Sequence, residues 1–275
     1  MTTIKDLKGF CYPLTPEGRA SLVGGLPWHY GTEYMVISYR ADAAAVARWL
    51  PAPLRPGPEP DMCYVAFSRW WSVWDAGDGM PSINPGQTQY EEAAIWAGCS
   101  VNGVPGQICL GIWVTRDFSM ARGWFMGFPK KLGEIMIGDY DPINPCMSEL
   151  GIDSKITGIC SSNGERLIRG SITIDRQIDK SELPPPLGRP LFHIRHFPSI
   201  VKGAKPSVLE LVRLGSENWN WDPIIWAGKG ELEFYPSEIE EHMALAPVEV
   251  LRAYRYRNGY TFDGGKVIHD WTKDL

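Results

Sequence analysis

The amino-acid sequence predicts a mainly β protein of the α+β class, built from antiparallel strands with few short helices. Three observations lead to this prediction. Short runs rich in β-branched and aromatic residues recur along almost the whole chain. The pair Asn163-Gly164 stands between two such runs and is a strong signal for a two-residue hairpin turn. Helix-like spacing of apolar residues is confined to a few short segments.

The expected elements follow one another along the chain. Residues 1–30 are rich in Gly and Pro and are expected to form an extended N-terminal arm. The Ala-rich segment 42–50 is expected to be a helix that Asp42 caps and Pro51 ends. A second short helix is expected at 237–240, which resembles a capping box. The expected strands cover residues 33–39, 62–67, 90–101, 107–115, 134–138, 153–160, 167–175, 191–197, 208–213, 224–226, 231–234 and 248–256.

Bulk composition narrows the class of protein. The strand-like runs continue through all 275 residues without a change of composition, so we expect a single domain spanning 1–275. The net charge is −5 and no basic block is present, so no nucleic-acid partner is expected. The chain lacks an apolar signal region and any run as long as a membrane span, so we expect a cytoplasmic protein without a membrane partner. The six cysteines lack metal-type spacing, as is typical of buried, reduced thiols.

The most informative segment is 127–133, with the sequence GFPKKLG. Lys130 and Lys131 follow an almost uncharged apolar run that includes Met126 and Phe128. A lysine in such surroundings is expected to lose part of its hydration, and burial disfavours the charged ammonium. An uncharged lysine amine attacks carbonyl groups and forms a Schiff base. A pair of solvated surface lysines is the alternative.

The neighbours of this lysine have expected roles of their own. Met126 and Phe128 are candidate substrate-binding residues. Lys131 is a candidate for lowering the pKa of the adjacent lysine by like-charge repulsion. Adjacent side chains of an extended segment point to opposite faces, however, which would leave burial as the main cause.

Schiff-base chemistry also requires an acid or base close to the nitrogen. Glu91 and Glu92 lie in an otherwise apolar predicted strand, where only one of them can face inward. The alternation alone does not decide which one does, and an exposed position for both is the alternative. Candidate polar partners for a substrate are Tyr90, Tyr254, Tyr256 and Tyr260. Either Arg122 or Arg69 is a candidate for holding a carboxylate by a bidentate contact, with a surface ion pair as the alternative.

The tryptophans are candidates for lining the site. Twelve tryptophans are many for this length, and residues 70–74 (WWSVW) and 219–221 (WNW) are candidates for an aromatic pocket wall. Core or oligomer packing is the alternative for them.

His193 and His196 are not spaced like zinc ligands and have no evident acidic third partner, so no metal is expected. The sequence also lacks a phosphate loop and a dinucleotide fingerprint, so we expect no nucleotide cofactor.

The lysine segment and its surroundings resemble the acetoacetate decarboxylase superfamily, the standard example of enzymes with an activated Schiff-base lysine. The resemblance is carried by GFPKKLG at 127–133, by the acidic pair that ends thirty-eight residues before Lys130, and by the turn sequence SVNGV at 100–104. Weaker similarity extends over most of the chain. The resemblance implies that Lys130 is the Schiff-base nucleophile and Glu92 the acid/base. It also implies a cone-shaped closed β-barrel within the sheet and assembly into homo-oligomers.

The chain departs from the decarboxylases at polar positions. Thr32 stands where that family has an arginine that orients the catalytic glutamate. Residues 62–67 contain no acid where the family has a second glutamate, and the segment from Arg122 to Trp124 lacks the glutamate of the family's Gly-Arg-Glu. We therefore expect a lyase similar to the aldolase-dehydratases, which join a keto acid such as pyruvate to an aldehyde, here one that is aromatic or unsaturated. A β-keto acid or acetoacetate decarboxylase is the enzymatic alternative. A non-catalytic β-barrel that binds a hydrophobic ligand is the alternative from another class.

Overall fold

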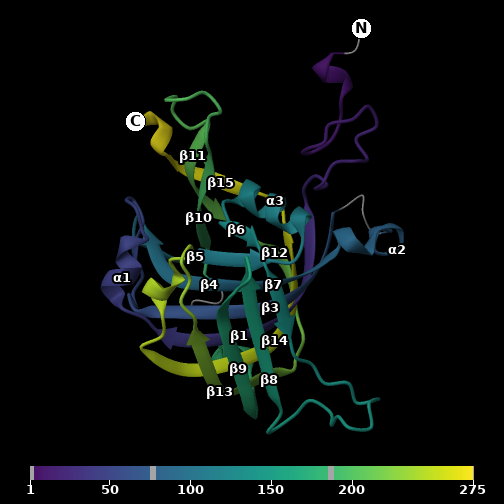
Figure 1. Ribbon diagram of the computed structural model, residues 1–275, viewed down its shortest axis with the longest axis vertical. Helices are drawn as coiled ribbons and strands as arrows, with labels where there is room; N and C mark the ends of the chain where they lie inside the picture. The colour runs from purple at the N-terminus through teal and green to yellow at the C-terminus, as the bar shows by residue number, and fades with distance from the viewer. Residues whose placement is uncertain (1–2, 75–78, 185–188, 275) are drawn as a thin grey trace.

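All fifteen strands that the computed structural model describes belong to one sheet (Figure 1). The structure describes residues 3–74, 79–184 and 189–274. The hydrogen-bonded strand order is β15-β11-β10-β5-β4-β3-β1-β14-β13-β9-β8-β7, with β2 beside β4, β6 beside β5 and β12 beside β14. The strands are β1 (Trp28–Arg40), β2 (Arg55–Pro56), β3 (Met62–Trp74), β4 (Gln89–Val101), β5 (Val104–Val114), β6 (Lys130–Leu132), β7 (Glu134–Ile137), β8 (Lys155–Ser162), β9 (Glu165–Ile178), β10 (Leu191–Phe197), β11 (Val208–Leu214), β12 (Glu217–Trp221), β13 (Ile225–Phe234), β14 (Glu249–Phe262) and β15 (Gly265–Asp270).

The helices are short, as the sequence predicts. Within the described ranges, three are α-helices, namely α1 (Ala43–Arg48), α2 (Met80–Ile83) and α3 (Asp117–Met126). The 3₁₀ turns are η1 (Ile4–Asp6), η3 (Pro85–Gln87), η4 (Lys180–Glu182), η6 (His242–Leu245) and η7 (Trp271–Lys273). The carboxylate of Asp42 accepts a hydrogen bond from the Ala45 backbone at 2.9 Å, which confirms the predicted cap of α1. No helix in the described ranges is long and apolar enough to span a membrane.

The segment before β1 only partly contacts the sheet: Phe10 packs on Trp28, and Val23 belongs to a buried cluster. Its described residues hold η1 and one isolated bridge, between Lys8 and Thr15, and the ribbon extends away from the body of the molecule (Figure 1). Residues 1–2 of the predicted arm lie outside the described residues.

The four strands β1, β3, β4 and β14 form the centre of the sheet, and their alternation separates two faces. On β4, Tyr90 and Ala94 belong to one buried cluster, whereas Ala93 and Ile95 belong to another. The larger cluster contains mostly aliphatic side chains from β1, β3, β8 and β9. The opposite face carries aromatic and buried polar side chains, among them Tyr90 and Glu92.

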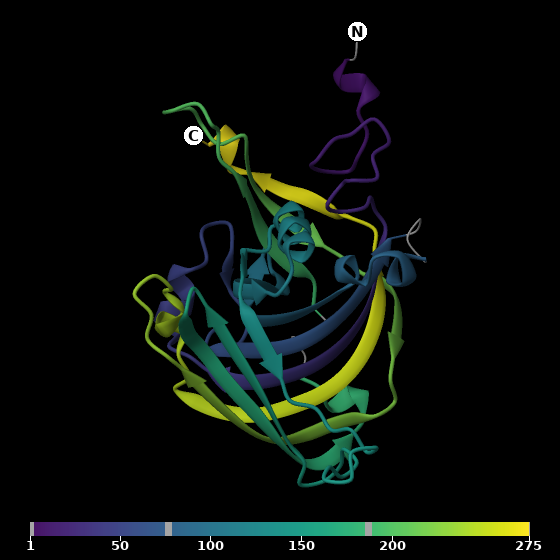
Figure 2. The ribbon, with the colours of Figure 1, turned by 45° about the vertical axis from the view of Figure 1, so that its right-hand side comes forward.

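The sheet is strongly curved, and the closed barrel that the family resemblance implied is not confirmed. Figure 2 shows the long strands bending around an interior. Among the described residues, however, β7 at one edge pairs only with β8, and β15 at the other edge pairs only with β11. Closure requires hydrogen bonds between the two edge strands. Those edges are short strands at opposite ends of the strand order, and no ladder joins them.

Two further predictions need correction. No helix begins at Ser237: its hydroxyl accepts from the Glu240 backbone at 2.9 Å, as a cap does, but the chain forms a 3₁₀ turn only from His242. The helix α3 was not predicted, because its ten residues include a central glycine and apolar side chains without a clear stripe. All six cysteines lie among the described residues without a disulfide; four are buried as expected, whereas Cys11 is partly buried and Cys146 is exposed.

Candidate active site

Lys130 begins the short strand β6, directly after α3. Gly127 ends the helix with a φ of 86°, a left-handed conformation that favours glycine. The backbone N–H of Phe128 donates to the Gly123 carbonyl at 2.9 Å, which turns the chain back towards the sheet. β6 then pairs in parallel with β5, with Lys130 opposite Ile112. This turn directs the Lys130 side chain into the interior, where the residue is 5% exposed.

The amine of Lys130 lies beside a buried carboxylate. Its Nζ is 2.9 Å from Glu92 Oε2, and the two side chains are 4% and 6% exposed. Nζ also donates to the hydroxyl of Ser119 at 3.0 Å. Buried pairs of oppositely charged side chains are rare in proteins, and active sites are where they concentrate.

The alternation of β4 settles which glutamate faces the lysine. Glu92 points to the interior, whereas Glu91 accepts a hydrogen bond from the Thr115 hydroxyl at 3.0 Å on the other face. The two strands that carry Glu92 and Lys130 are not neighbours, because β5 lies between β4 and β6. The side chains therefore meet across β5, which supplies only small or apolar side chains at this point.

The helix α3 supports the lysine from the opposite side. Ser119 and Gly123 lie one turn apart on its buried face. A Cβ atom at Gly123 would lie 2.3 Å from Cδ of Lys130, so the absence of a side chain there makes room for the lysine stem. Ser119 and Gly123 were not recognised in the sequence, since their role depends on a helix that was not predicted.

Arg122 is the second buried cation of this region. The residue is 3% exposed, and its Nη2 donates to the Ser72 hydroxyl at 3.0 Å. Its guanidinium lies over the rings of Tyr30 and Phe118 at 4.9 Å and 5.3 Å. Among the described residues no carboxylate forms an ion pair with it. A buried guanidinium with aromatic walls and no acidic partner can bind an anionic ligand.

Arg69, the other candidate for holding a carboxylate, lies on the opposite face of the sheet. Its Nη1 is 2.6 Å from Asp139 and 3.2 Å from Glu33. Its role is thus a structural ion pair, the alternative that the sequence left open.

Lys131 also points away from the site. Its side chain is 54% exposed and its Nζ is 2.7 Å from Glu240 Oε2. The role of a like-charge neighbour that modulates Lys130 is therefore not supported, because the extended backbone of β6 directs the two ammonium groups to opposite faces.

Aromatic side chains enclose the lysine. The Lys130 Nζ lies 5.1 Å from the Tyr90 ring centroid and 5.6 Å from that of Phe128. Trp70 stacks on Tyr90 with the ring planes 2° apart. Burial raises the pKa of Tyr90, and the Glu92 carboxylate raises it further, so the phenol stays protonated. Of the predicted tryptophan wall, Trp70 faces the interior and Trp71 is 41% exposed on the other face.

The remaining predicted substrate-binding residues lie at different depths. Tyr256 and Tyr260 are on the interior side of β14, opposite Tyr34 and Tyr30 of β1. Burial raises the pKa of Tyr260, and the neighbouring Tyr30, Tyr90 and Glu92 add to this, which places its hydroxyl in the same electrostatic region as the ion pair. Tyr254 is only partly buried and packs against the cluster that contains Tyr64 and Tyr256. Met126 is partly buried at the border of the cluster that contains Tyr30 and Tyr90.

His193 of β10 is an interior residue that was not selected from the sequence. It is fully buried, and its ring centroid lies 4.1 Å from that of Phe128. Burial, followed by the charge of Lys130, lowers its pKa to about 3. No local signal marks this histidine, because only the pairing of β10 with β5 and β11 brings it inward.

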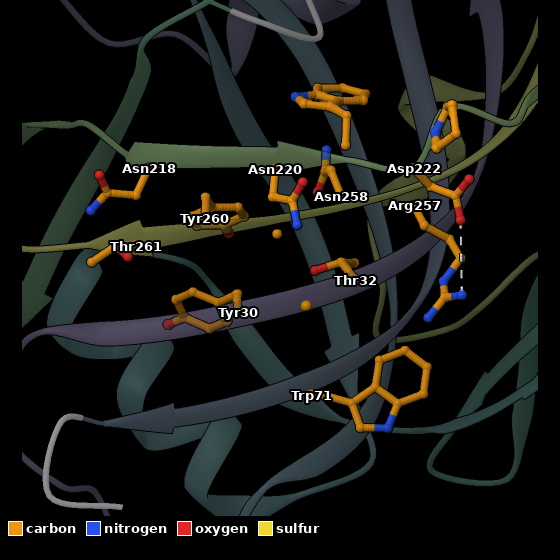
Figure 3. Close-up of a pocket in the computed structure, with 14 residues that line it drawn as sticks. Tyr30, Thr32, Trp71, Asn218, Asn220, Asp222, Arg257, Asn258, Tyr260 and Thr261 are labelled. Atoms are coloured by element: carbon orange, nitrogen blue, oxygen red, sulfur yellow. Dashed lines mark ion pairs between the residues drawn. The ribbon is translucent and has the colours of Figure 1, made fainter. Parts of the chain in front are cut away.

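A hollow of about 600 Å³ lies between β1, β3, β12 and β14, and Figure 3 shows its polar lining. Lys130 and Glu92 are not among the residues that line it. Tyr30 and Tyr260 line it, however, and Arg122 lies over the Tyr30 ring at 4.9 Å. The hollow is thus separated from the buried cations by tyrosines. In the part of the chain that the structure describes, no group of three His, Cys, Asp or Glu residues is placed to hold a metal ion.

Comparison with known proteins assigns the family. A family model described as acetoacetate decarboxylase (ADC) matches residues 11–271. The chain therefore belongs to the acetoacetate decarboxylase family, and its enzymatic relatives make it a lyase. The alternative of a non-catalytic ligand-binding barrel is set aside accordingly.

The individual relatives include an acetoacetate decarboxylase, found by sequence, and solved structures of similar enzymes. The acetoacetate decarboxylase of Chromobacterium violaceum is 28% identical over 97% of this chain and 96% of its own length. The structure of the enduracididine biosynthesis enzyme MppR complexed with pyruvate is 30% identical, covers 96% of this chain and 99% of its own, and has a TM-score of 0.88. MppR complexed with the condensation product of pyruvate and imidazole 4-carboxaldehyde is 31% identical, covers 95% of this chain and 96% of its own, and has a TM-score of 0.87. An acetoacetate decarboxylase-like enzyme from Sphingomonas wittichii RW1 is 28% identical over 95% of this chain and 99% of its own, with a TM-score of 0.88.

Proposed function

We propose that this lyase forms a Schiff base between Lys130 and pyruvate, condenses the resulting enamine with an aromatic aldehyde, and eliminates water from the product. The observation that carries the proposal is the buried contact of 2.9 Å between Lys130 Nζ and Glu92 Oε2. The iminium formed on Lys130 withdraws the electrons in this reaction.

The contact prepares the amine for attack. Only the uncharged amine is a nucleophile. Because neither group is hydrated, movement of the shared proton from nitrogen to the carboxylate gives two neutral groups and avoids the burial of two ions. The hydroxyl of Ser119, 3.0 Å away, holds the nitrogen in place during this transfer.

The Glu92 carboxylate then acts as the base that removes protons from carbon. When the carbinolamine loses water, Glu92 returns its proton to the departing hydroxyl and becomes a carboxylate again. The iminium that results withdraws electrons from the adjacent methyl group, and the Glu92 carboxylate removes a proton from that carbon to give the enamine. After the carbon–carbon bond has formed, Glu92 is placed to remove the next α-proton and to assist the loss of water. Hydrolysis of the final iminium releases an unsaturated keto acid and restores the lysine.

Arg122 favours condensation over decarboxylation. A buried guanidinium without an acidic partner would hold the carboxylate of a keto acid. This contact stabilises the substrate carboxylate, which decarboxylation converts to neutral carbon dioxide. The contact therefore works against the expulsion of carbon dioxide. In pyruvate the carboxylate is retained throughout, and the contact only orients the substrate. The MppR complexes with pyruvate and with its aldehyde condensation product support the same choice.

Decarboxylation of acetoacetate or a related β-keto acid is the second candidate, favoured by the acetoacetate decarboxylase relatives. It uses the same Schiff base and the same enamine. The two candidates differ only in whether the enamine arises by loss of carbon dioxide or of a proton.

Product analysis tests the choice. The protein is incubated with pyruvate plus benzaldehyde or imidazole 4-carboxaldehyde, and separately with acetoacetate. We expect an unsaturated keto acid from the first mixtures, and carbon dioxide from acetoacetate no faster than with Lys130→Met. Rapid release of carbon dioxide, without condensation in the first mixtures, would instead identify a decarboxylase.

A further inference from the structure

His193 combines complete burial with two unused ring nitrogens. It is 0% exposed, and neither Nδ1 nor Nε2 has a hydrogen-bond partner among the described residues. An unsatisfied buried polar group costs folding free energy, so both nitrogens of one imidazole are seldom left unpaired. By comparison, the other buried histidine, His242, bonds the Leu167 carbonyl through Nε2 at 3.1 Å. A ligand that completes the site would remove this cost.

The position of His193 relates it to the catalytic pair. Phe128 lies between the two: its ring centroid is 4.1 Å from that of His193 and 5.6 Å from Lys130 Nζ. Trp96 extends the aromatic surface, with its centroid 5.8 Å from the imidazole. The imidazole is neutral, because burial and the charge of Lys130 lower its pKa to about 3. One of its nitrogens therefore donates and the other accepts.

The condensation needs a donor at a place that the known site residues do not serve. When the enamine attacks an aldehyde, the pair of π electrons of the carbonyl moves to oxygen, and negative charge develops there. Ser119 is engaged at the lysine nitrogen, Arg122 is set aside for the keto-acid carboxylate, and Glu92 delivers its proton only after the alkoxide has formed. Fixed donors aimed at a developing oxyanion are among the largest contributions to catalysis.

We propose that the His193 N–H donates a hydrogen bond to the carbonyl oxygen of the acceptor aldehyde while the aldehyde ring packs on Phe128 and Trp96. This assignment rests on the proposed function. In the step, the enamine carbon bonds to the aldehyde carbon and the enamine nitrogen becomes an iminium again. The proton that Glu92 took from the methyl group passes to the new alkoxide. His193 stabilises the oxygen and exchanges no proton.

The test separates the two halves of the reaction. Exchange of the pyruvate methyl protons with deuterated water requires Lys130 and Glu92 but no aldehyde, whereas condensation with benzaldehyde requires every group. For His193→Phe, which keeps the ring and removes both nitrogens, we expect exchange within threefold of the wild type. We expect kcat for condensation to fall about a hundredfold, the effect of removing one oxyanion donor. His193→Gln, which retains an N–H donor, is expected to recover part of this loss.

His242→Phe is the matched control, because it removes a buried imidazole on the opposite face, beside Trp113. It is expected to leave both rates unchanged. Thermal unfolding of each variant checks that the fold is retained. Condensation by His193→Phe within threefold of the wild type overturns the assignment. A loss seen with imidazole 4-carboxaldehyde but not with benzaldehyde also overturns it, since His193 would then bind the ring. If the wild type shows neither exchange nor a borohydride-trapped adduct, the proposed function itself fails, and this inference with it.

Discussion

The carboxylate of Glu92 and the amine of Lys130 meet at 2.9 Å across an intervening strand, although thirty-eight residues separate them in the chain. Both side chains are almost completely removed from solvent. A proton moves between them without a change in the net charge of the interior. In the proposed function, this one contact provides both the nucleophile and the base.

Replacement of Glu92 by Gln is expected to separate imine formation from turnover. The amide keeps the shape of the carboxylate but cannot accept a proton. The adduct with pyruvate should still form, while turnover falls at least about a hundredfold, the lower range for acid–base catalysis. Glu91→Gln is the control, since Glu91 bonds Thr115 on the other face, and it should turn over normally. Near-normal turnover of Glu92→Gln would remove Glu92 from the mechanism.

A methyl group at Gly123 is expected to displace the lysine without harming the helix. The new Cβ would lie 2.3 Å from Lys130 Cδ, a flexible stem that can move aside. Alanine favours a helix over glycine by about 1 kcal/mol, so stability should be retained. A displacement of the reacting atom by about 1 Å costs about a hundredfold in rate. Steady-state kinetics and thermal unfolding of Gly123→Ala measure the two effects. Gly151→Ala, where no atom lies within 4 Å of the added methyl, is the control. Unchanged kinetics for Gly123→Ala would contradict the packing argument.

Removal of the Arg122 charge should weaken binding of the keto acid. A hydrogen bond to a charged group contributes about 1.5–3 kcal/mol, so KM for pyruvate should rise between about tenfold and a hundredfold in Arg122→Met. The aldehyde has no carboxylate, and its KM should change little. Arg69→Met is the control: it breaks the ion pairs with Glu33 and Asp139 and should affect stability rather than KM. An equal rise of both KM values in Arg122→Met would argue for a general packing defect.

The buried imidazole of His193 predicts how stability depends on pH. Its pKa is about 3 in the folded protein, against about 6.5 when unfolded, so the unfolded chain binds the extra proton between these values. The contribution of this group is present above about pH 6.5 and is lost as the pH falls towards 3, by about 1.4 kcal/mol per unit. Chemical unfolding of the wild type and of His193→Phe across this range measures the difference. Parallel pH profiles for the two proteins would contradict the assignment of a neutral imidazole.

Local sequence patterns predicted most of the strands and marked Lys130 as a candidate nucleophile, whereas the choice of Glu92 rested on the family resemblance. The apolar run around Lys130 indicated a buried lysine, and the alternation of β4 allowed only one of the two glutamates to face inward. Those properties depend on neighbours in the chain, which is why they could be predicted.

Other features depend on contacts between distant segments. Ser119, Gly123 and Arg122 share one face of α3, a helix whose glycine and apolar side chains give no clear helical pattern. His193 enters the site only because β10 pairs with β5 and β11. The open edges of the sheet are likewise set by long-range pairing, so the closed barrel that the family resemblance implied could not be tested from the sequence.

Trapping of the imine tests the central claim most directly. The protein is mixed with pyruvate, reduced with borohydride and digested, and the modified peptide is located by mass spectrometry. The account predicts one stable adduct on Lys130, which is retained in Lys131→Met and absent from Lys130→Met. An adduct on Lys131, or an unmodified Lys130 with both pyruvate and acetoacetate, would contradict it.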